Sequence, residues 1–122
     1  MQYNPNNSQL SDTNLADFLR SEITGDLLEV PGISNKQIIL LNRGGDITDQ
    51  ITNTHQLIGK FLMLKMLNEN TNKPITSQEH CDKFLKYLKN KGITSHRNDI
   101  VMAIAEKTNT MFPGLYDPYI YN

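Results

Sequence analysis

The chain has 122 residues, a formal net charge of −1 and hydrophobic residues at 38% of positions, which predicts one globular domain with a modest core. Its single cysteine, Cys81, excludes an internal disulfide and a zinc site built from several thiolates, and it favours a reducing compartment. Residues 1–12 contain neither an apolar run nor a basic start, so we expect no targeting peptide. The longest apolar stretch is too short to cross a bilayer. We therefore expect an intracellular protein of the nucleus or cytoplasm, without membrane insertion.

Charge is distributed unevenly along the chain. Residues 1–50 carry three basic and seven acidic groups, whereas residues 51–122 carry nine basic and six acidic groups. Residues 83–97 include no acidic side chain, and their basic residues are Lys83, Lys86, Lys89, Lys91 and Arg97. The neutral total argues against strong nonspecific nucleic-acid binding, but a local basic surface remains compatible with weak binding.

The first third of the chain predicts a tail, a helix and a helix-hairpin-helix motif. We expect residues 1–12 to form a flexible Asn-rich tail, followed by a helix over 14–23. One helical turn over 26–30, a tight connection over 31–34 and a second helix over 35–43 then give the order of a helix-hairpin-helix motif. The residues expected to pack inward are Leu27, Leu28, Ile33, Ile38 and Leu41.

A third helix is predicted from Thr54 to about Leu67. Its apolar residues cover a wide arc, so we expect this helix to lie at the centre, with every other helix packed on it. Those residues are Leu57, Ile58, Phe61, Leu62 and Leu64. A polar loop over 68–75 follows.

Two further helices complete the domain. Thr76 and Glu79 form a capping box for the fourth helix, and Gly92 ends it. Ser95 is the expected cap of a fifth helix that reaches about Phe112. This helix carries two apolar stripes: Ile100, Ala103, Ile104 and Met111 on one, and Val101, Ala105, Thr108 and Phe112 on the other. Two stripes indicate an additional surface to cover, either by a second copy of the chain or by the extended aromatic tail over 113–122.

The predicted fold is therefore all-α, a compact five-helix domain over 13–112 with one helix-hairpin-helix motif, of the class that SAM domains represent. No pair of titratable groups is placed to cooperate in catalysis, so we expect no enzyme, no metal and no cofactor. The three histidines, expected in surface or capping roles, are not spaced as metal ligands: His55, His80 and His96.

The hairpin is the one element with specific chemistry. Backbone N–H groups over 30–36 and the dipole of the following helix suit a phosphate group, and Lys36 adds a full charge. The alternative is that the hairpin only packs helices, which is favoured by Ser34 at the position where a second glycine is usual.

Several segments resemble the barrier-to-autointegration factors, a family of small dimeric DNA-bridging proteins of chromatin and the nuclear envelope. The segments are Asp17-Phe18, Gly32-Ile33-Ser34, Gln56 to Lys65, Phe84 to Lys89, and Ser95 to Asp99. The resemblance implies a homodimer in which Gly32, Ser34, the start of the next helix and Arg97 touch DNA phosphates.

We thus predict non-enzymatic, sequence-nonspecific binding and bridging of double-stranded DNA. The expected contact residues are Gly32, Ile33, Ser34, Asn35, Lys36 and Arg97. The alternative is a protein–protein adaptor that has lost DNA binding, which is favoured by the neutral charge, the acidic first half and the aromatic tail.

Overall fold

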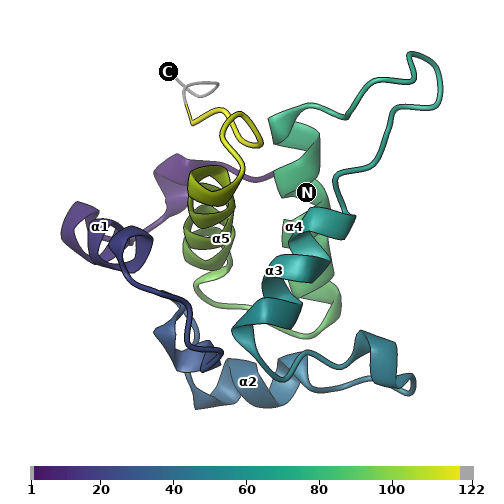
Figure 1. Cartoon of the computed structure of the whole chain (residues 1–122). Helices are drawn as coiled ribbons and strands as arrows, with labels where there is room; N and C mark the ends of the chain where they lie inside the picture. Colours follow the sequence, from purple (N-terminus) through teal and green to yellow (C-terminus); the bar gives the residue numbers. More distant parts are fainter. Residues whose placement is uncertain (1, 119–122) are drawn as a thin grey trace.

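The computed structural model describes residues 2–118 and contains five α-helices and three short 3₁₀ helices (Figure 1). The α-helices are α1 (Asp12–Arg20), α2 (Asn35–Leu41), α3 (Thr54–Met63), α4 (Ser77–Asn90) and α5 (Arg97–Met111). The 3₁₀ helices are η1 (Pro5–Asn7), η2 (Leu27–Glu29) and η3 (Ile47–Asp49). The described residues form no strand, only one isolated bridge between Leu67 and Pro74. The predicted all-α domain of five helices is confirmed.

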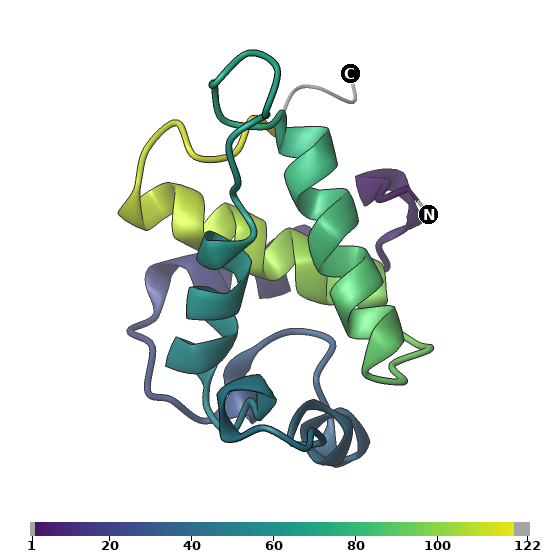
Figure 2. The same cartoon turned by 90° about the vertical axis from the view of Figure 1, so that its right-hand side faces the viewer.

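The central helix is α5, and the prediction that the third helix would be central is wrong. In both views α5 passes through the middle, and α1, α3, α4 and η1 pack around it (Figures 1 and 2). Two small residues on it, Ala103 and Ala105, are fully buried and let the neighbouring helices approach closely. By contrast α3 ends at Met63, whose side chain is exposed, and its buried residues lie on one face only.

Both apolar stripes of α5 are covered within the chain. Ile100 and Ile104 of the first stripe and Val101 and Thr108 of the second are fully buried. Only the last member of each stripe is exposed: Met111, which ends the helix, and Phe112, which follows it. The additional surface expected from the sequence is therefore filled by the other helices. The stripes give no reason for a second copy to pack there.

One of the helices that pack against α5 is α1, and the buried side chain of Lys107 on α5 connects the two by hydrogen bonds. The Lys107 ammonium donates to the carbonyls of Phe18 at 3.0 Å and Leu19 at 3.1 Å, and to the carbonyl of Ser21. A cation at this position is favoured by the helix dipole, and it adds to the hydrogen bonds that the Phe18 carbonyl accepts from the Ser21 N–H and hydroxyl. The helix ends at Arg20, before the predicted boundary at 23, because the backbone at Ser21 turns to an extended conformation.

The N-terminal segment packs against the helices, which its Asn-rich composition did not predict. Tyr3 is fully buried, and its N–H donates to the Asp82 carboxylate on α4 at 2.6 Å. Further along, Ser8 and Gln9 bind the Asp99 carboxylate of α5. These polar contacts join residues that are 79 to 91 positions apart in the sequence, which composition does not reveal.

At the other end, the chain lies over the helices as far as it is described. Tyr116 is buried, and its N–H donates to the Asn109 side chain at 3.2 Å. The Lys65 ammonium donates to the Leu115 carbonyl at 3.2 Å. The remainder of the predicted tail, residues 119–122, lies outside the described residues.

Candidate nucleic-acid interface

The hairpin turn is pressed against the start of α5. Gly32 has a φ of +95°, and a β-carbon there would lie 3.0 Å from Ile100 Cγ1 and 3.1 Å from the His96 carbonyl oxygen. Only glycine fits this combination of backbone conformation and contact. Ile33 is buried behind the turn as predicted, but Leu28 is 50% exposed and does not pack inward.

A buried glutamine joins the hairpin to the loop before α5. Gln37 is 4% exposed; its side-chain oxygen accepts the Ser34 N–H at 3.0 Å and also the Ser34 hydroxyl. Its amide nitrogen donates to Ser95 Oγ at 3.2 Å. Ser95 is thus a partner of the hairpin, and it is not the cap of the fifth helix.

These contacts reduce the number of backbone donors available to a phosphate. The Ile33 N–H donates to the Val30 carbonyl at 3.1 Å, and the Ser34 N–H is held by Gln37. Two of the N–H groups expected to face a phosphate are therefore occupied. The N–H groups of Asn35 and Lys36 lie in the first turn of α2, where no carbonyl of the same helix can accept them.

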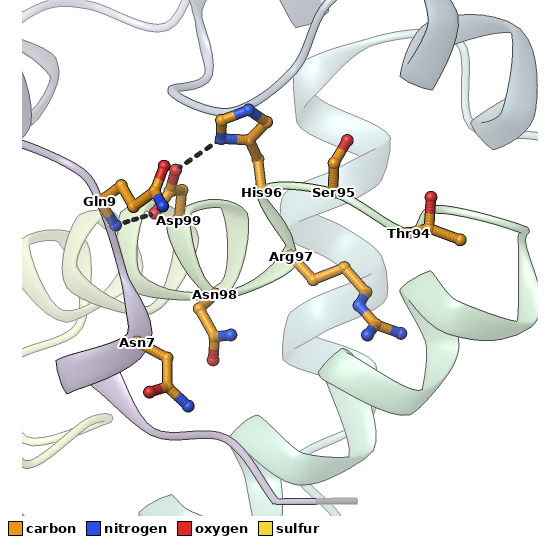
Figure 3. Close-up of a pocket in the computed structure, with 8 residues that line it drawn as sticks. All are labelled: Asn7, Gln9, Thr94, Ser95, His96, Arg97, Asn98 and Asp99. Carbon is orange, nitrogen blue, oxygen red and sulfur yellow. Dashed lines mark hydrogen bonds and ion pairs between the residues drawn. The ribbon is translucent and has the colours of Figure 1, made fainter.

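The start of α5 contributes a hydrogen-bonded cluster around a buried carboxylate. His96, in a left-handed conformation with φ of 58°, precedes the helix, and its Nδ1 lies 3.0 Å from Asp99 Oδ2 (Figure 3). Asp99 Oδ1 accepts the Ser8 hydroxyl at 2.6 Å and the Gln9 N–H at 2.8 Å. Burial raises the pKa of Asp99, but hydrogen bonds from Ser8, His96 and Gln9 outweigh it and hold the pKa below its usual value.

Two adjoining cavities contain most of the predicted contact residues. The smaller cavity has a volume of about 260 Å³, and Arg97 is among the residues that line it (Figure 3). The larger has a volume of about 560 Å³, and its lining includes the hairpin turn and Lys36. Gln9, Ser95, His96 and Asp99 line both. Gly32, Ile33 and Ser34 face the larger cavity, whereas Asn35 lines neither. We call the surface formed by these two cavities the hairpin face.

The side chains of the hairpin face carry an excess of positive charge. Lys36 is exposed and Arg97 is partly exposed, while the one lining carboxylate, Asp99, is buried and engaged by three donors. Figure 3 shows Arg97 extending toward α4 and His96 pointing to the opposite side of the helix start. His96, 50% exposed in its side chain, was not predicted as a contact residue, although its spacing of three from Asp99 at a helix start is a recognisable signal.

None of the residues with strongly shifted pKa values lines the hairpin face, and two of them, His80 and Cys81, belong to the core. His80, expected at the surface, is instead fully enclosed, and its Nε2 lies 2.6 Å from the Phe61 carbonyl oxygen. Burial raises the pKa of the neighbouring Cys81 thiol to about 12. Within residues 2–118, no three His, Cys, Asp or Glu side chains are grouped so that they could hold a metal ion.

Over the described part of the chain, no helix has the length and apolar character needed to span a membrane. The chain was compared with family models, with curated proteins and with solved structures, and none of the three comparisons finds a match. The resemblance to the barrier-to-autointegration factors therefore stays a prediction.

Proposed function

We propose that the hairpin face binds the phosphate backbone of duplex DNA, weakly and without sequence preference. The observation that carries this proposal is the pair of adjoining cavities, in which Lys36 and Arg97 supply positive charge around a buried carboxylate that is already satisfied. Phosphate contacts of this kind position a protein on DNA but carry no sequence information.

The geometry assigns the binding to side chains more than to the turn itself. Because the N–H groups of Ile33 and Ser34 are occupied, the remaining donors are the two cations, the Gly32 N–H and the first N–H groups of α2. Such a surface neutralises about two phosphates. The logarithm of the affinity should then fall with the logarithm of salt concentration with a slope of roughly −2 per chain.

The test is a fluorescence anisotropy titration of a short duplex at about 50 mM salt, where phosphate contacts are favoured. Lys36→Glu and Arg97→Glu should each reduce the affinity at least tenfold, since each replaces an attraction by a repulsion. Lys73→Glu makes the same change of charge in the exposed loop between α3 and α4, far from α2 (Figure 1), and should bind almost as the wild type does. Equal losses in all three variants, or no binding by the wild type, would refute the proposal.

Bridging of two duplexes requires a second hairpin face, because one chain contains one. We propose a homodimer as its source. Light scattering at tens of micromolar protein should then give about twice the 13.9 kDa of one chain. A mass of one chain in the presence and absence of DNA would remove bridging while leaving single-duplex binding intact.

A specific observation also favours the adaptor function. Several large apolar side chains are exposed, which is typical of surfaces that contact another protein when they gather into a patch. They are Leu28, Ile39, Ile47, Met63, Met66, Leu67, Met111 and Phe112. One stoichiometric protein partner that is recovered after nuclease treatment, together with failure of the DNA titration, would establish this alternative.

A further inference from the structure

A third cavity lies at the end of α2 that is remote from the hairpin turn. It has a volume of about 430 Å³, and the side chains that give it its charge are Arg43, Asp49, Lys60 and Lys91. Tyr87, whose ring lies within 6 Å of the Lys60 and Lys91 ammonium groups, and Asn90 also line it. We call it the Tyr87 pocket. Three cations around one carboxylate form a local positive field in a chain whose total charge is −1.

The hydroxyl of Tyr87 is buried and has no hydrogen-bond partner. Burial and the nearby charge of Asp49 raise the pKa of Tyr87 to about 12, so the group is a protonated donor at neutral pH. Buried polar groups in native proteins nearly always have a partner, and an exception calls for an explanation such as a ligand. An acceptor that enters the pocket would supply what is missing.

The cations of the pocket are placed for different tasks. Lys91 donates to the backbone carbonyls of Arg43 and Asp49, so it offsets the partial negative charge of carbonyls at this end of the molecule. Lys60 lies over the Tyr87 ring, with its ammonium 4.9 Å from the ring centroid. Neither Lys60 nor Arg43 forms an ion pair within the described residues, which leaves both charges available.

We propose that the Tyr87 pocket binds the phosphate group of a ligand, through the charges of Lys60 and Arg43 and a hydrogen bond from the Tyr87 hydroxyl. One carboxylate against three cations leaves two positive charges, which balance the two negative charges of a phosphate dianion. Donors that come from different elements suit an anion with several oxygens. The pocket shares no lining residue with the hairpin face, so it is independent of the proposed DNA contact.

The test is thermal unfolding with inorganic phosphate as the probe, compared with chloride at equal ionic strength. Phosphate at ten times its dissociation constant raises the ratio of folded to unfolded protein about tenfold, which for this size corresponds to a rise of roughly 5 °C in the melting temperature. Lys60→Gln and Tyr87→Phe should remove most of this rise. Lys83→Gln, an exposed lysine on the first half of α4, should retain it.

The melting temperature of Tyr87→Phe in chloride is a second test, and it does not depend on the affinity for phosphate. Because the hydroxyl has no partner, its removal should leave the melting temperature in chloride unchanged or higher. A clear loss of stability in chloride would show that the hydroxyl already has a partner and would overturn the proposal. So would a phosphate effect that is absent from the wild type up to about 50 mM, or equal in Lys60→Gln and wild type.

The phosphate group has two possible sources, a small phosphorylated ligand or a nucleic-acid backbone. Comparing the duplex affinity of the single variant Arg97→Glu with that of the double variant Arg97→Glu/Lys60→Gln distinguishes the two sources. A further loss of duplex affinity in the double variant identifies the DNA backbone, whereas equal affinity with an intact phosphate effect in Arg97→Glu identifies a small ligand. Failure of the DNA proposal leaves the phosphate titration unaffected, so the two proposals fail separately.

Discussion

Acidification should destabilise this protein through one buried histidine. His80 is 1% exposed, its ring stacks on Phe61 at a centroid distance of 3.9 Å, and its Nε2 lies 2.6 Å from the Phe61 carbonyl oxygen. Burial lowers the pKa of His80 from 6.5 to about 4; the Phe61 carbonyl opposes this shift and the charge of Lys65 adds to it. The neutral ring is therefore the form that the folded protein accommodates.

The size and direction of the effect follow from that shift. Between pH 6.5 and 4 the unfolded chain binds a proton at this residue more readily than the folded protein does, so stability falls as pH falls. The contribution of His80 to the free energy of unfolding is fully present above pH 6.5 and is lost progressively down to about pH 4. A difference of 2.5 pKa units corresponds to about 3 kcal/mol in the free energy of unfolding.

Urea unfolding at pH 7 and at pH 4 measures this loss, and His80→Gln serves as the matched variant that cannot titrate. The wild type should lose about 3 kcal/mol more than the variant between the two pH values. Carboxylates such as Glu29 and Asp99, whose pKa values are lowered, titrate in both proteins and cancel in the comparison. Equal losses in the two proteins would show that His80 accepts a proton without cost and would refute the reasoning.

Three other experiments test the packing directly, two with variants and one with the wild type. Lys107→Met should lower the free energy of unfolding by about 2–3 kcal/mol in urea, because it leaves the last carbonyls of α1 without their charged donor; a loss below about 0.5 kcal/mol would contradict this. Gly32→Ala should cost about 2 kcal/mol or more and weaken duplex binding together with folding, because its β-carbon meets the His96 carbonyl oxygen; unchanged stability would show that the turn adapts. Burial and the charge of Asp82 raise the pKa of the Cys81 thiol to about 12, so Cys81 should react with a thiol reagent at pH 8 only after unfolding. Rapid reaction of the folded protein would place this thiol at the surface.

Elements whose signals are local were predictable from the sequence. The fourth helix begins after Thr76 and ends before Gly92 as expected, because a capping box and a glycine with φ of +92° act within a few residues of the helix ends. The turn at Gly32 was predicted for the same reason, since it needs a residue in the left-handed region.

Features that depend on distant residues were not predictable in this way. Gln37 reaches Ser95, and Tyr3 reaches Asp82, across 58 and 79 positions of the chain. Neither contact produces a periodic pattern, so the link from Gln37 to Ser95 and the docked N-terminal segment were both missed. The occupied Ser34 N–H has a local signal that was overlooked, because Ser34 and Gln37 form a capping box. The central position of α5 was hidden as well, because its alanines signal close packing only when the neighbouring helices are known.

The central position of α5 also has a consequence for how the chain is made. The four other α-helices are translated before it, yet α1, α3 and α4 bury their apolar faces largely against it. During synthesis these helices have no core to join until residues 97–111 have left the ribosome. Folding should therefore follow release of the last helix as a single late event, and a ribosome stalled before that helix should hold a chain open to proteolysis.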